Sequence, residues 1–215
     1  MTHPADKKPP DLVIEDWGLV DYGEALARQH ARVAARLRGE IPDTFIFCQH
    51  YSVMTLGRGT DRANILVKDV PIFEVERGGD VTWHGPGQLV GYFIRLLPEG
   101  TRDLRAHLRL MEEVVIRAMA SAGLRGFRTD GKTGVWVHHD GVDRKIASLV
   151  IAARNWCTYH GFALNVNPDL SNFRRINPCG FDAGVMTSTS ACGNELPLSD
   201  WEILASQSLR SVMSP

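Results

Sequence analysis

The stretch that decides the fold is residues 134–166, GVWVHHDGVDRKIASLVIAARNWCTYHGFALNV. It holds three β-rich runs, at residues 134–138, 145–153 and 157–166. The runs are separated by Asp140-Gly141 and Arg154-Asn155, pairs that favour tight turns. Strands joined by connections this short are antiparallel neighbours. The stretch therefore predicts an antiparallel sheet built from consecutive hairpins.

The segments on either side of this stretch predict more strands and three helices. Further strands are expected at residues 44–48, 53–56, 72–76, 81–83 and 89–96, and amphipathic helices at residues 22–38 and 104–123. Ser199 and Glu202 form a capping box, which predicts a last helix running to about Met213. Strands grouped with a few flanking helices indicate an α+β fold with a mostly antiparallel sheet.

Length and charge limit the classes of protein to which this chain can belong. The chain has 215 residues, with 24 Lys and Arg against 25 Asp and Glu, and 44% of its residues are hydrophobic. This balance disfavours strongly basic nucleic-acid binders, and the length favours one domain. We expect that domain to span residues 12–215, after a loose, polar leader over residues 1–11 (MTHPADKKPPD).

The sequence carries no signal for a membrane, a metal or a disulfide framework. The longest uncharged apolar run, residues 146–153, is far shorter than the roughly 20 residues that cross a bilayer. The cysteines at 48, 157, 179 and 192 show no CxxC spacing, and the amino terminus has no apolar signal-peptide core. We therefore expect a cytoplasmic protein without a bound metal or other cofactor.

The densest unusual segment is RGGDVTWHGPGQL at residues 77–89. Its glycines let backbone amides approach a ligand closely, and Arg77 and His84 offer polar contacts. The alternative interpretation is a glycine-rich hairpin with a chance histidine. The segment matches neither GxGxxG nor a phosphate-binding Walker loop.

Two further residues are candidates for chemistry. Lys145 opens the apolar run KIASLVIAA, where partial burial would lower the pKa of its amine, although it can also be a surface cation beside Arg144. Cys179 lies in the rigid turn Asn-Pro-Cys-Gly, which can hold a thiol outside the regular sheet. His160 is interpreted as a structural histidine that makes one hydrogen bond.

The other three cysteines are not candidates. Cys48 and Cys157 lie in β-rich apolar runs and are predicted to be small core residues, and Cys192 sits in a polar loop.

Four motifs in order, RGGDVTWHGPGQLVGYF, RKIASL, TYHGFALNVNPDL and INPCGF, resemble the lipoyl(octanoyl) transferase family. The resemblance implies the fold of biotin and lipoate protein ligases and a Cys/Lys acyl transfer. It matches Cys179 and Lys145 to the catalytic pair. The matched acyl-substrate contacts are Arg77, Gly78, Gly79, Asp80, Val81, Thr82, Trp83, His84, Ser148, Leu149, Val150, Gly161, Phe162 and Ala163.

The resemblance also implies the substrates. The donor would be octanoyl-acyl carrier protein, and the acceptors would be lipoyl domains of 2-oxoacid dehydrogenases and the glycine cleavage H protein. A Cys179 thiolate would exchange one thioester for another without ATP, and the acceptor lysine would then attack. Lys145 would favour the thiolate and relay protons. Arg58, Arg62 and Lys68 are our candidates for docking the acidic carrier protein.

Two positions depart from the family pattern, and three alternatives remain open. Val150 stands where the family commonly has Gly, and Ala152 where it commonly has Arg, so the acyl pocket is expected to differ. The alternatives are an ATP-dependent lipoate ligase of the same fold, a non-catalytic acyl-protein binding module, and a Cys179/His84 hydrolase.

Overall fold

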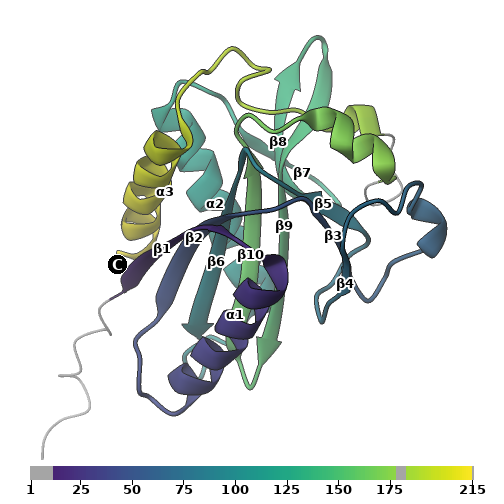
Figure 1. Cartoon of the computed structure of the whole chain (residues 1–215). Helices are drawn as coiled ribbons and strands as arrows, with labels where there is room; N and C mark the ends of the chain where they lie inside the picture. The colour runs from purple at the N-terminus through teal and green to yellow at the C-terminus, as the bar shows by residue number, and fades with distance from the viewer. Residues whose placement is uncertain (1–11, 178–182, 215) are drawn as a thin grey trace, which may run out of the picture.

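A seven-stranded sheet runs through the centre of the molecule, and helices lie against both of its faces (Figure 1). This computed structural model describes residues 12–177 and 183–214, so Cys179 and the expected leader over residues 1–11 lie outside the described residues. The strand order is β1-β2-β6-β10-β9-β8-β7, and every neighbouring pair is antiparallel except β1 and β2. The predicted α+β class with a mostly antiparallel sheet is confirmed.

A second sheet of three strands, in the order β4-β3-β5, lies beside the first one. The strands are β1 (Val13–Val20), β2 (Thr44–His50), β3 (Val53–Leu56), β4 (Ile72–Glu74), β5 (Thr82–His84), β6 (Gln88–Leu96), β7 (Phe127–Thr129), β8 (Lys132–His139), β9 (Val142–Arg154) and β10 (Cys157–Asn165). The α-helices are α1 (Tyr22–Leu37), α2 (Leu104–Ser121) and α3 (Leu198–Met213).

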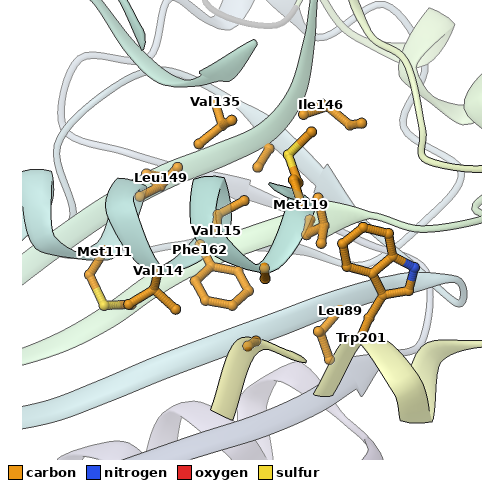
Figure 2. Close-up of a cluster of buried hydrophobic side chains, with 14 of the residues drawn as sticks. Leu89, Met111, Val114, Val115, Met119, Val135, Ile146, Leu149, Phe162 and Trp201 are labelled. Atoms are coloured by element: carbon orange, nitrogen blue, oxygen red, sulfur yellow. The ribbon is translucent and has the colours of Figure 1, made fainter. Parts of the chain in front are cut away.

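The larger core lies between the main sheet and helices α2 and α3. Figure 2 shows Val115 of α2 above Phe162 of β10, with Met111 of α2 on one side of that ring and Trp201 of α3 on the other. All four side chains are at most 2% exposed. This face is therefore largely filled by packed side chains.

Helix α1 covers part of the opposite face of the sheet. Its Ala25 and Val33 pack in one cluster with Ile46 of β2 and Tyr92 of β6. Beyond α1, the loop that precedes β5 and the residues after the last short helical turn (Ala183–Val185) face the strands. The cavity described below lies in that part of the face.

The prediction of three consecutive antiparallel strands is confirmed, and the errors lie at the edges of the main sheet. Strands β8, β9 and β10 pair antiparallel in sequence order, and Cys48 and Cys157 are fully buried, as expected. Edge strands β1 and β7 were not predicted, because β1 has one buried residue among eight, β7 has none, and both lack a continuous apolar face.

The predicted capping box is wrong. Helix α3 begins at Leu198 after Pro197, and no side chain caps it. Pro197 fixes the entry of the chain, so Ser199 already lies within the first turn, where its hydroxyl contacts Asp200.

No helix among the described residues is both long and apolar enough to cross a membrane.

His107 of α2 makes stability depend on pH. Its ring is 2% exposed, lies 5.4 Å from that of Phe93, and has no hydrogen-bond partner among the described residues. Burial, with Arg95 nearby, lowers its pKa from 6.5 to about 3. Below pH 6.5 the unfolded chain therefore binds a proton at His107 that the folded chain does not bind. The free energy of unfolding consequently decreases as the pH falls.

Replacing His107 by Leu should flatten this dependence. Urea unfolding should show that the free energy of unfolding decreases from pH 7 to pH 5 by about 2 kcal/mol less in this variant than in the parent protein. His138→Leu, at an exposed position, is the control and should keep the parent's difference. An unchanged difference in His107→Leu would show that the ring is protonated in the folded protein.

Candidate functional site

A cavity of about 410 Å³ lies against the main sheet on the face that α1 leaves uncovered. This volume is in the range of small-molecule sites. Its walls come from β9 and β10, from the loop before β5, from the hairpin between β7 and β8, and from Val185 and Met186. The residues of the expected site that line it are Arg77, Gly78, Gly79, Asp80, Val81, Thr82, His84, Lys145, Ser148, Leu149, Val150, Gly161, Phe162 and Ala163.

Trp83 is the one expected contact among the described residues that does not line the cavity. Its side chain is 1% exposed, donates from Nε1 to Ser52 Oγ at 2.8 Å, and packs edge-on against Phe173. In a β-strand, successive side chains point to opposite faces, so Trp83 turns away while its neighbours Thr82 and His84 face the cavity.

Lys145 reaches the cavity because β9 carries a bulge. Val135 pairs with Ala147 and Trp136 with Lys145, so one step along β8 matches two along β9, and Ile146 is the extra residue. Ile146 and Ala147 both belong to the helix-side core, and Lys145 joins Ser148 on the cavity side. Without the bulge, alternation would send Lys145 into the core.

The surroundings of Lys145 are those of a buried amine rather than of a surface cation. The residue is 8% exposed, and its Nζ lies 6.0 Å from the centroid of the Trp136 ring. Its backbone carbonyl accepts from the Thr187 N–H at 3.0 Å. The alternative of a snorkelling surface lysine is thereby wrong.

Arg77 holds the glycine-rich loop in place. Its guanidinium is buried and donates to Thr55 O at 2.7 Å, to Thr55 Oγ1 at 2.8 Å and to Asp80 O at 2.7 Å. These bonds tie the loop to β3, and a further bond reaches Gly78 O. Arg77 therefore shapes the wall, and much of its donor capacity is already used on the backbone.

His84 is a neutral polar group in the wall. Its ring stacks on that of Tyr22 with centroids 6.1 Å apart, and its Nδ1 lies 3.1 Å from Gln88 Oε1. Burial lowers its pKa to about 3, with His50 and Arg77 adding to the shift. An imidazole with so low a pKa is a weak general base near neutral pH, which disfavours the Cys179/His84 hydrolase.

The backbone at His160 is strained within a central strand. Its φ is +61°, a conformation that residues other than glycine seldom adopt. The ring lies 4.8 Å from that of Tyr159 and 6.3 Å from that of Tyr92, so two successive side chains of β10 face α1. The backbone N–H leaves the strand ladder and donates to Gln29 Oε1 of α1.

The ring of His160 lines the cavity but makes no bond at Nε2. That nitrogen is buried and has no hydrogen-bond partner among the described residues, so the expected structural bond is missing there. Burial, together with Arg77 and His30, lowers the pKa of the ring to about 3. Strain of this kind gathers at functional sites.

Sequence reasoning missed several other wall residues. Tyr22 opens α1, Tyr92 lies in β6, and Trp136 of β8 has the Nζ atoms of Lys132 and Lys145 at 4.9 and 6.0 Å from its ring centroid. Tyr92 lies within the motif RGGDVTWHGPGQLVGYF but was not singled out, and Tyr22 and Trp136 belong to none of the four motifs. The alternation of β6 and β8 could have placed Tyr92 and Trp136 on a shared face, but not beside a cavity.

Both described flanks of Cys179 meet this site. On one side, Asn177 donates its N–H to Asn64 O, and the Asn64 side chain donates to Asp80, a lining residue. On the other side, Met186 pairs with Lys145 and also lines the cavity.

The three expected docking cations differ in their surroundings. Arg58 and Lys68 are exposed, whereas Arg62 is paired with Glu74.

Comparison with known proteins gives consistent results. The model of the family described as "Lipoyl protein ligase A/B catalytic domain" matches residues 21–208. A protein named octanoyltransferase from Syntrophotalea carbinolica is 47% identical over 177 residues, which cover 82% of each chain. One of the same name from Geobacter metallireducens is 44% identical over 190 residues, covering 88% of this chain and 87% of the relative.

The fold also resembles solved structures. A structure of a bipartite lipoate protein ligase and its E2 lipoyl domain from Thermoplasma acidophilum matches with a TM-score of 0.72 at 14% identity. The match covers 94% of this chain and 83% of the other. At that identity the likeness shows the fold alone.

Replacing Arg77 by Lys tests its role as a loop anchor. One ammonium cannot span Thr55 O and Asp80 O in the fork geometry of a guanidinium. Losing two bonds from a charged donor should lower the free energy of unfolding by about 3 kcal/mol. Limited proteolysis should then cut within residues 77–82. Arg62→Lys, at an exposed position, should change stability by less than about 0.5 kcal/mol, and equal effects of both variants would contradict the assignment.

Proposed function

The chain belongs to the lipoyl protein ligase A/B catalytic domain family, and we propose that it transfers octanoyl groups through a thioester on Cys179. The relatives that are named octanoyltransferase support the reaction. The enzyme is an acyltransferase that acts in protein lipoylation.

The observation that carries this proposal is the buried Lys145 on the wall of a cavity shared with Val150, Phe162 and Ala163. Aliphatic and aromatic walls suit an octanoyl chain, and a lysine amine beside them suits a reacting carbonyl and thiol. The flanks of Cys179 meet the same wall, through Asp80 on one side and Met186 on the other, which supports pairing Cys179 with Lys145.

The reaction has two steps. In the first, the Cys179 thiolate attacks the octanoyl thioester of the donor, the bond between carbonyl carbon and donor sulfur breaks, and the donor thiol leaves with a proton. In the second, the acceptor lysine amine attacks the acyl-cysteine, forms an amide and releases the Cys179 thiol. Lys145 holds or transfers the proton in each step, and its cationic form favours the thiolate.

The proposed donor is octanoyl-acyl carrier protein, and the proposed acceptors are lipoyl domains, those of 2-oxoacid dehydrogenases and the glycine cleavage H protein among them. Thioester exchange preserves the activation of the acyl group, so the reaction needs no ATP. An ATP-dependent ligase of the same fold would need no acyl-cysteine.

Mass analysis of the protein after mixing with octanoyl-acyl carrier protein tests the proposal. One octanoyl group should be found on Cys179, and adding a lipoyl domain should move it to the acceptor lysine. Cys179→Ala should lose both the adduct and the transfer, whereas Cys192→Ala, a control at the half-buried cysteine among the described residues, should keep them. Transfer by Cys179→Ala, or transfer that requires ATP, would overturn the proposal.

Val150 should restrict the shape of the acyl chain. Its side chain lines the cavity, and its Cγ1 lies 3.8 Å from where a β-carbon on Gly79 would sit. Val150→Gly should therefore admit longer chains. Room for two more methylenes is worth about 1.6 kcal/mol, or about 15-fold in acyl preference.

Rates with hexanoyl, octanoyl and decanoyl donors measure this effect. Ala152→Gly, two residues on in the same strand but outside the cavity lining, is the control and should keep the parent's profile. If Val150→Gly and the parent gave the same profile, Val150 would not contact the chain.

A further inference from the structure

Glu112 is a fully buried carboxylate that the proposed reaction does not use. It lies on α2, one turn after Leu108, which lines the cavity, and its side chain is 1% exposed. It is not among the residues that line the cavity. A buried carboxylate is costly unless its oxygens are satisfied, so its partners indicate what it does.

The two oxygens of Glu112 have different partners. Oε2 accepts from Arg109 Nη1 at 2.8 Å and from Arg128 Nε at 3.1 Å. Oε1 accepts from the backbone N–H of Gly134 at 3.1 Å. The two arginines compensate the charge, and the remaining oxygen is aimed at one peptide of β8.

Gly134 sits where β8 leaves the regular ladder. Between the Phe127–Trp136 pair and the Thr129–Lys132 pair, β7 advances by two residues and β8 by four. Strand β8 therefore contains two extra residues relative to β7. Pairing with β9 begins only at Val135, and Gly134 has a φ of +120°. Its N–H is therefore satisfied by Glu112 instead of a neighbouring strand.

The side chain of Lys145 packs against the α-carbon of Gly134, which has no side chain. A β-carbon built on Gly134 would lie 2.7 Å from Lys145 Cε and 3.4 Å from Nζ. It would also lie 2.6 Å from Ala147 O, on the other side of the bulge at Ile146. The stem of Lys145 thus rests on Gly134, and any shift of this peptide shifts the amine.

We propose that Glu112 is a positioning residue for Lys145. Its Oε1 fixes the Gly134 peptide, and that peptide fixes the path by which the lysine crosses into the cavity. The importance of this positioning for catalysis rests on the proposed function of Lys145. The placement of the Lys145 amine by Glu112 does not depend on that function.

Two substitutions at Glu112 distinguish the effect of side-chain length from the effect of charge. Glu112→Gln keeps an oxygen that can accept from Gly134 but removes the charge. Glu112→Asp keeps the charge but is one methylene too short for the same bond. If the bond to Gly134 positions Lys145, the Gln variant should behave like the parent at Lys145 even when it is less stable, and the Asp variant should not.

The primary measurement is amine labelling of the intact protein, followed residue by residue with mass spectrometry. The rate at Lys145 should change in Glu112→Asp and stay at the parent value in Glu112→Gln, with exposed Lys68 as the internal reference. Octanoyl transfer should fall by about 100-fold in kcat for the Asp variant, the size expected of a misplacement of about 1 Å, with the donor KM unchanged.

Glu113→Asp is the matched control. Glu113 is adjacent on α2 and pairs with Arg117 and Arg128, but it does not contact Gly134. It should alter neither labelling of Lys145 nor kcat. Parental labelling at Lys145 in Glu112→Asp, or altered labelling in Glu112→Gln alone, would overturn the positioning role. Full transfer by Lys145→Met would instead overturn the catalytic role of the lysine and leave the labelling result standing.

Discussion

A regular β-strand sends successive side chains to opposite faces, and this alternation is the constraint on which the cavity depends. One face of the main sheet is packed against α2 and α3, so most side chains in phase with that core are unavailable to a ligand. Two strands break the phase at the cavity, β9 at Ile146 and β10 at His160. These breaks bring Lys145 and the His160 ring to the open face, and a perfectly alternating sheet of the same residues would present neither.

Burial decides the charge as well as the shape of the cavity. His84 and His160 both have pKa values lowered to about 3, so their rings are neutral around pH 7. They supply polarity without charge along a wall that also includes Tyr92. The cations among the described lining residues are Arg77, Lys132 and Lys145, and only Lys145 is proposed to take part in the chemistry.

The sequence predicts repeating features well and irregular ones poorly. The hairpins β8 to β10 follow from β-rich runs and turn pairs, and the cavity residues between Arg77 and His84 follow from the glycine-rich motif. The bulge at Ile146 could not be predicted from the sequence pattern, because Ile is favoured in a β-strand whichever face its side chain points to. Glu112 resembled any helix acid, since only the tertiary fold brings Gly134 to it.

The bonds that Arg77 makes to Thr55 and Asp80 have a thermodynamic consequence for the ligand. A loop already held by buried charged hydrogen bonds has little conformational freedom left to lose when an acyl chain enters. The free energy of desolvating the chain then appears almost in full as affinity, instead of being offset by ordering the wall. The cavity is therefore expected to bind acyl chains with a large negative heat-capacity change and little entropic penalty from the protein.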